Sequence, residues 1–110
     1  MITTRKAGQN ATQAVSTTVL RVFGASSWTG ADINSTQQRR VTVTNDGAST
    51  AYLQEVDKDA TLTGSVSSSD YLVALSAGQS ATFDLAPTVT LAVLSAASST
   101  IRAVEYLEAA

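Results

Sequence analysis

The sequence predicts an all-β protein built as an antiparallel β-sandwich, and three observations lead to that fold class. The apolar runs are short and rich in β-branched residues, which fit a pleated surface better than a helix. Turn residues bound nearly every run, at the spacing expected for about six to eight short strands. The chain has 110 residues, of which 44% are hydrophobic, so it can bury the core of one domain without covalent help.

The first sixteen residues are polar and show no clear periodicity. They are rich in threonine, glutamine, asparagine and alanine. We therefore expect an extended N-terminal arm over residues 1–16 that is frayed or becomes ordered against a partner. A single β-sandwich domain is expected over residues 17–110. Its first strand covers residues 17–23, and a loop-like stretch follows over 24–38.

The clearest predicted strand covers residues 39–44. Val41 and Val43 share one face and the residues between them share the other, so one face is expected in the core and the other in water. An Asn-Asp-Gly turn follows at residues 45–47, and these residue types tolerate the positive φ of tight hairpins. Because residues 51–56 read as a returning strand, the pattern predicts a β-hairpin over about residues 39–57.

The second half of the chain contains four more predicted strands. An apolar run over 71–75 is closed by a turn at Gly78, and the alternating strand over 81–85 ends before Pro87, which cannot donate to a ladder. Residues 89–94 and 100–107 are expected to form the last two strands.

The facing of the last strand stays open, because apolar and charged residues share each of its sides. Together these strands predict a sandwich of the jelly-roll or immunoglobulin-like type, without choosing between the two.

The residues that most enzymes use are missing from this chain. It has no histidine and no cysteine, which removes the commonest general base, metal ligand and thiol nucleophile. No G-x-S-x-G or phosphate-loop motif is present. We therefore expect a protein that is not an enzyme, with no cofactor and no bound metal.

The composition and the lengths of the apolar runs argue against nucleic acids and membranes as partners. The sequence pI is about 4.8 and aromatic residues make up 5% of the chain, so nucleic-acid binding is disfavoured. No apolar run approaches the ~18 residues needed to cross a bilayer, so no membrane partner is expected.

The charges are unevenly distributed along the chain. Residues 1–40 hold five basic residues against one acid, and the rest hold two against eight. This asymmetry suits either neighbour contacts in an assembly or ordinary surface scatter.

Three carboxylates recur at every second position, at Glu55, Asp57 and Asp59. On a continuing strand they would project from one face, which suits either a calcium site or a carboxylate pair. The alternative is a solvated strand face at the end of the hairpin, with Lys58 interleaved. We favour the solvated face, because the spacing does not match an EF-hand.

Five residues are candidate partner contacts. The Arg39-Arg40 doublet could bind an anion, but we favour a pair of edge charges that blocks unwanted strand pairing. Trp28 could anchor an interface, stack on a sugar or plug one end of the sandwich. Arg5 and Lys6 supply the positive charge of the predicted arm.

Two segments carry a resemblance to a known family. VTVTNDGASTAYL (41–53) and LSAGQSATFDL (75–85) combine a strand and Asn/Gly turn with a Gly-Gln-Ser turn into a strand. The pattern resembles immunoglobulin-like repeats of bacterial surface proteins and small β-sandwich accessory virion proteins of tailed bacteriophages. The ending from Leu91 to Glu105 is similar to the virion proteins. The initial methionine, the lack of an export signal and the single-domain length favour the virion setting.

The virion resemblance implies a capsid cement or decoration protein, made in the host cytoplasm without a signal peptide. Such a protein is a homo-oligomer, with a trimer favoured, that binds the major capsid protein or another virion protein and staples neighbouring subunits. An extended arm of sixteen residues would span up to about 50 Å, enough to reach a neighbour. A tail, neck or fibre component of the same virion and an immunoglobulin-like adhesive or carbohydrate-binding module remain alternatives.

Overall fold

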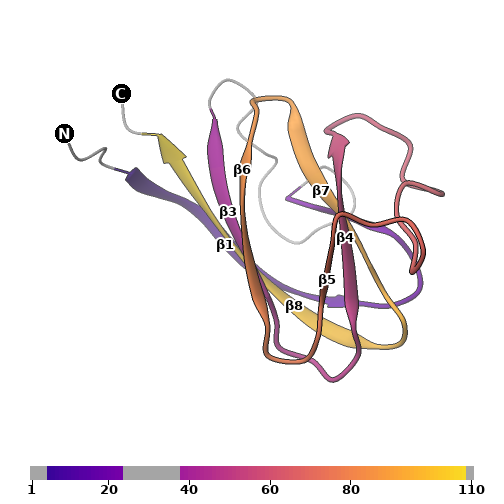
Figure 1. Cartoon of the computed structure of the whole chain (residues 1–110). Helices are drawn as coiled ribbons and strands as arrows, with labels where there is room; N and C mark the ends of the chain where they lie inside the picture. Colours follow the sequence, from indigo (N-terminus) through magenta and orange to yellow (C-terminus); the bar gives the residue numbers. More distant parts are fainter. Residues whose placement is uncertain (1–4, 24–37, 109–110) are drawn as a thin grey trace.

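A computed structural model describes residues 5–23 and 38–108 of the chain, and its regular elements are all β-strands. The strands form two four-stranded sheets whose pairings are all antiparallel. The two sheets pack face to face as a sandwich (Figure 1). The predicted all-β sandwich is thereby confirmed.

Each sheet draws its strands from all parts of the chain. Sheet A has the order β1-β8-β3-β6, and sheet B has the order β2-β7-β4-β5. Sheet A comprises β1 (Arg5–Val15), β8 (Ser99–Glu108), β3 (Arg39–Asn45) and β6 (Ser80–Leu85). Sheet B comprises β2 (Leu20–Val22), β7 (Val89–Ser95), β4 (Ala51–Asp57) and β5 (Val73–Leu75).

This strand order is that of a jelly roll. Successive strands lie in opposite sheets, except for β4 and β5, and the first and last strands are neighbours in sheet A. A jelly roll places eight strands in two sheets through Greek-key connections. The structure therefore decides between the two sandwich types that the sequence left open.

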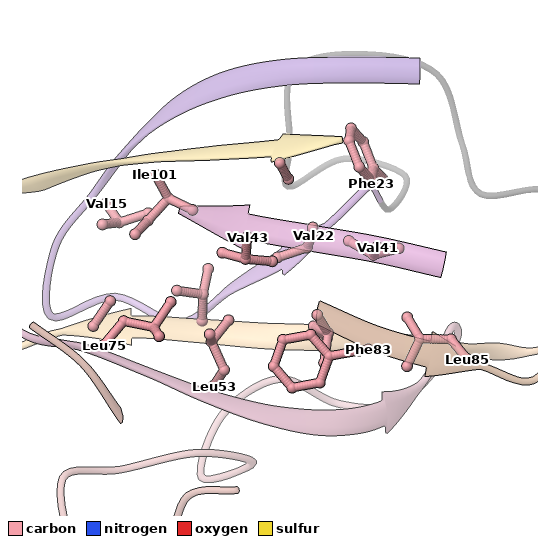
Figure 2. Close-up of a cluster of buried hydrophobic side chains, with 14 residues drawn as sticks. Val15, Val22, Phe23, Val41, Val43, Leu53, Leu75, Phe83, Leu85 and Ile101 are labelled. Atoms are coloured by element: carbon pink, nitrogen blue, oxygen red, sulfur yellow. The ribbon is translucent and has the colours of Figure 1, made fainter. Parts of the chain in front are cut away.

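The core lies between the sheets and is filled by their inward rows of aliphatic and aromatic side chains (Figure 2). In β3 the burial alternates residue by residue, with Val41 and Val43 inside, as predicted. Fully burying a side chain of this size contributes about 1.5–3 kcal/mol. Sheet A contributes Val41, Val43, Phe83, Leu85, Ile101 and Ala103, and sheet B contributes Val22, Ala51, Leu53, Leu75, Leu91 and Val93.

The facing of β8 is settled by its contacts with the core. Ile101, Ala103 and Glu105 are buried, whereas Arg102 and Tyr106 are exposed. A glutamate therefore occupies the inward row of the last strand. The turn at Gly78 is confirmed as well, because this residue has a φ of 82°, which L side chains rarely adopt.

The predicted hairpin over residues 39–57 is wrong, although both of its strands exist. β3 pairs with β6 and β8, and β4 pairs with β5 and β7, so the two strands lie in different sheets. Residues 45–47 do not adopt the positive φ that a two-residue hairpin requires. Gly47 is needed for a different reason: a Cβ there would lie 2.0 Å from the Ser99 hydroxyl oxygen.

Asn45 lies at the corner where the chain leaves β3 for sheet B. Its buried side-chain amide donates to the backbone oxygens of Ser49 (2.7 Å) and Leu75 (2.9 Å). Its Oδ1 accepts from the Gly47 amide (3.0 Å) and from the Ser99 hydroxyl (2.9 Å). These four bonds hold segments from both sheets at one corner, and they satisfy the side chain completely.

The predicted N-terminal arm over residues 1–16 is corrected for Arg5–Val15, and its first four residues lie outside the described chain. Arg5–Val15 is β1, which pairs with β8 along its whole length and belongs to the sandwich domain. Of the β1 side chains that the structure describes, only Val15 is in the core. Asn10, Thr12 and Ala14 are exposed, so the described side chains show none of the apolar alternation by which a strand is recognised in a sequence.

Candidate interaction surface

Arg39 is buried and is not available to a partner, contrary to the prediction. Its side chain is 0% exposed and occupies the inward row of β3. Its Nη1 lies 3.4 Å from Oε2 of Glu105, and its Nη2 donates to the backbone oxygens of Ala86 (3.1 Å) and Val89. Arg39 therefore closes one end of the core, where the chain passes from β6 to β7.

The electrostatics of this buried pair follow from its position. Burial lowers the pKa of Arg39, because the charged guanidinium loses water, and the nearby Glu105 carboxylate counteracts part of that effect. The Arg39 Nε atom is buried without a hydrogen-bond partner. The pair is thus a structural ion pair with incomplete hydrogen bonding.

Arg40 points to the opposite side, on the outer face of sheet A. Its Nε donates to Oδ1 of Asp84 (2.9 Å) and its Nη2 donates to Oδ2 (3.3 Å); the Arg40 side chain is 42% exposed and that of Asp84 is 69% exposed. The interpretation of the arginine doublet as edge charges is wrong, because β3 lies between β8 and β6. Of the doublet, only Arg40 is accessible to a partner.

The remaining predicted contacts lie near or beyond the limits of the described chain. Arg5 and Lys6 open β1, opposite Glu108 and Leu107 of β8. Trp28 lies outside the described residues. Among the predicted contacts that the structure describes, Arg39 and Arg40 lie on opposite faces of sheet A and so do not form one site.

The alternating carboxylates form no cluster in the structure. Glu55, Asp57 and Asp59 are exposed. The Asp57 carboxylate accepts from the Asp59 backbone amide (3.0 Å), and Lys58 Nζ lies 3.0 Å from Asp59 Oδ2. Among the described residues, no group of three acidic, histidine or cysteine side chains could hold a metal ion.

The outer face of sheet A is polar and regular. Thr42 and Thr82 share a hydroxyl hydrogen bond of 3.0 Å across β3 and β6, and Thr44 and Ser80 share one of 2.7 Å. Tyr106 is the exposed large apolar side chain on this face. These rows follow from the β3–β6 register, which sets hydroxyl opposite hydroxyl.

On the side of sheet B, the loop before β5 instead exposes an aromatic and an aliphatic side chain. The rings of Tyr52 and Tyr71 lie 5.1 Å apart with an interplanar angle of 49°, a tilted geometry typical of aromatic pairs. Tyr71 is 44% exposed and the adjacent Leu72 is 50% exposed. Leu94 is the register partner of Tyr52 in β7.

A cavity of about 370 Å³ adjoins this row, because Leu94 also lines it. Its walls come from the β1–β2 connection and from the long loop between β4 and β5. The lining residues are Thr17, Thr18, Val19, Leu62, Thr63, Gly64, Val66 and Leu94. We refer to Tyr52, Tyr71, Leu72, Leu94 and this cavity as the sheet B surface.

Sequence reasoning missed the sheet B surface. It placed Tyr71 and Leu72 inside a predicted strand over 71–75, whereas β5 begins only at Val73. The run of serines and the aspartate directly before Tyr71 was the available signal, because such residues favour a loop over a strand interior. The pairing of Tyr52 with Tyr71 depends on the course of that loop and could not be read from the sequence.

Comparison with known proteins supports the fold alone. No protein-family model matches the chain, and no curated protein matches it. A solved structure from a study titled "Bacillus endospore appendages form a novel family of disulfide-linked pili" is similar, with a TM-score of 0.50 and 12% identity. The match covers 100% of this chain and 93% of that one. Within the described part of the chain, no helix is long and apolar enough to span a membrane.

Proposed function

We propose that this chain is a non-enzymatic virion protein of a tailed bacteriophage that binds the outside of the capsid. There it stabilises contacts between neighbouring major capsid subunits, as a cement or decoration protein. The proposal combines the sequence resemblance with a rigid sandwich that exposes an apolar surface. A fold by itself does not imply a function, so the surface has to carry the argument.

The sheet B surface is the observation that carries the proposal. Tyr71 and Leu72 are adjacent, both are about half exposed, and Tyr71 packs on Tyr52. The exposed Tyr71, packed on the half-buried Tyr52 beside an open cavity, offers a partner both a flat area and a recess for a side chain. Grouped apolar exposure of this kind marks protein contacts, and tyrosine is enriched among residues that dominate binding energy.

The polar chemistry of the described residues supports a structural role. The buried Arg39–Glu105 pair is enclosed in the core, and the exposed Arg40–Asp84 and Arg102–Asp46 pairs join neighbouring segments of sheet A. Each charged pair thus links parts of the fold. None of these groups lines the cavity, whose walls are apolar and hydroxyl side chains.

The proposal is tested by the double substitution Tyr71→Ser and Leu72→Ser. We expect occupancy of purified capsids to fall at least about tenfold, because two anchor side chains are removed. Tyr106→Ser on the outer face of sheet A is the matched control and should leave occupancy unchanged. Circular dichroism should show both variants folded. Full occupancy by the double variant would overturn the proposal.

An adhesive or carbohydrate-binding module is the second candidate function. The exposed Tyr71 ring offers a stacking face for a sugar, and Ser67, Ser69 and Asp70 precede it in the same loop. A glycan array separates the candidates, since it should show binding that Tyr71→Ala removes if this function holds. Binding to isolated capsids without glycan binding favours the decoration protein.

A tail, neck or fibre component would differ only in its location within the particle. Detection of the protein in separated heads and tails decides this point. The pilus protein shares the fold, but this chain has no cysteine and cannot form the disulfide links that the study's title describes. If this chain forms filaments, they are held by contacts other than disulfides.

A further inference from the structure

The four edge strands of the sandwich are protected from pairing to different degrees. β2 and β5 have three residues each, and β6 has six, including the charged Asp84. β1 has eleven residues, and no described strand pairs with its outer edge. Short length and charge are common means by which proteins block edge pairing, and β1 is not short.

The charges of β1 are confined to its beginning. Arg5 and Lys6 are its only charged residues, and Gln9–Val15 contains neither charge nor proline. A register shift separates Ala7 from Gln9, so the ladder with β8 is uninterrupted from Gln9 to Val15. Asn10, Thr12 and Ala14 are exposed. Among the described residues, the segment Gln9–Val15 is therefore an unpaired edge that carries neither charge nor proline.

We propose that two copies of this chain associate through β1, antiparallel, about a two-fold axis at Thr12. Sheet A would then continue from one copy into the other, with its four strands doubled. A two-fold interface uses the same patch on both copies, so the patch must be complementary to itself. Gln9–Val15 meets that condition, because an uncharged segment sets no like charges opposite each other.

The register explains why a second copy fits better than an unrelated strand. With Thr12 opposite Thr12, Gln13 is opposite Ala11 and Asn10 is opposite Ala14, so these two amide residues face small ones, while Gln9 is opposite Val15. Arg5 and Lys6 of the two copies fall at opposite ends of the shared ladder, beyond Val15 of the partner. Like charges are thereby kept apart. The inference concerns self-association and holds whether or not the protein binds a capsid.

Crosslinking through an introduced cysteine tests the register directly. The chain has no cysteine, so Thr12→Cys supplies the only thiol. Opposed residues in antiparallel strands have Cα atoms about 4.5–5.5 Å apart, within the range of a disulfide. Mild oxidation should convert most Thr12→Cys chains to a covalent dimer on a non-reducing gel. Thr82→Cys, exposed on edge strand β6, is the matched control and should remain monomeric.

A charge substitution tests the same interface without a covalent bond. Thr12 is the register partner of Arg102 in β8, so Thr12→Glu gains a neighbour of opposite charge within the monomer and should fold. Across the two-fold axis, two glutamates would repel each other. The dissociation constant of the dimer, measured by sedimentation, should therefore rise at least about tenfold. Mixing Thr12→Glu with Thr12→Lys chains should restore the dimer.

The mass of the wild-type protein in solution supplies the decisive outcomes. A dimer that Thr12→Glu dissociates supports the inference. A monomer at micromolar concentration, a trimer, or a dimer that Thr12→Glu leaves intact would each overturn it. Because capsid occupancy is measured separately, failure of this interface and failure of the proposed function are distinguishable.

Discussion

The inward row of β3 has a buried polar side chain at each end, and the two side chains differ in charge and in hydrogen bonding. Both ends place a polar side chain in the core, Arg39 at one and Asn45 at the other. Asn45 is neutral and all of its hydrogen-bonding groups have partners. Arg39 is charged, and its Nε has no partner. Burial of a neutral, fully bonded group costs little, whereas a buried charge depends on its counterion.

The two ends therefore have different roles: Asn45 stabilises the course of the chain between the sheets, whereas Arg39 links neighbouring strands and the β6–β7 connection. The Asn45 corner ties four segments together and directs the chain from sheet A to sheet B. The Arg39–Glu105 pair joins β3 to β8 and reaches the β6–β7 connection. Replacing such a pair by apolar residues is often neutral or stabilising, so this pair need not contribute net stability.

The largest effect is expected for Glu105→Ala. Loss of the carboxylate leaves the buried Arg39 charge uncompensated, which should lower the free energy of unfolding by about 3–5 kcal/mol. Urea denaturation measures this change. The double variant Arg39→Met with Glu105→Leu is the control and should be close to the wild type. If Glu105→Ala unfolds at the wild-type midpoint, the buried Arg39 charge does not depend on the Glu105 carboxylate for its stability.

A somewhat smaller effect is expected for Asn45→Ala. The substitution leaves two backbone oxygens, one amide and one hydroxyl without their partner, and should cost about 2–4 kcal/mol in thermal or urea unfolding. Asn45→Asp keeps the shape but loses both amide donors, so it should be destabilised to a similar degree. A wild-type melting temperature for Asn45→Asp would contradict the role of the two donors.

The smallest effect is expected for Arg40→Ala, next to Arg39 in sequence. Its partner Asp84 is largely exposed, and exposed ion pairs contribute about 0–1 kcal/mol. Because salt screens exposed charges, the effect should shrink further in 1 M sodium chloride. A loss above 2 kcal/mol would show that Arg40 has a structural role comparable to that of Arg39. Because the two arginines are adjacent in sequence, a difference in their stability losses reports the effect of burial.

Much of the fold could be predicted because strand signals are local. The alternation over 39–44 and 81–85 identified β3 and β6 within a residue or so, since one buried face imposes a period of two. β1 could not be recognised, because its ladder uses backbone groups that every residue carries. The sheet B surface could not be recognised either, because it depends on a long loop placing Tyr71 against Tyr52.

The sequence by itself determined the all-β class, most strand positions and the turn at Gly78. The tertiary structure alone decided which strands pair, and it replaced the predicted hairpin by a jelly-roll corner at Asn45. It also decided that Arg39 is buried while Arg40 is exposed. The physical reason is that periodicity reports which face of a strand avoids water, whereas pairing and charge burial depend on partners that lie far away in the chain.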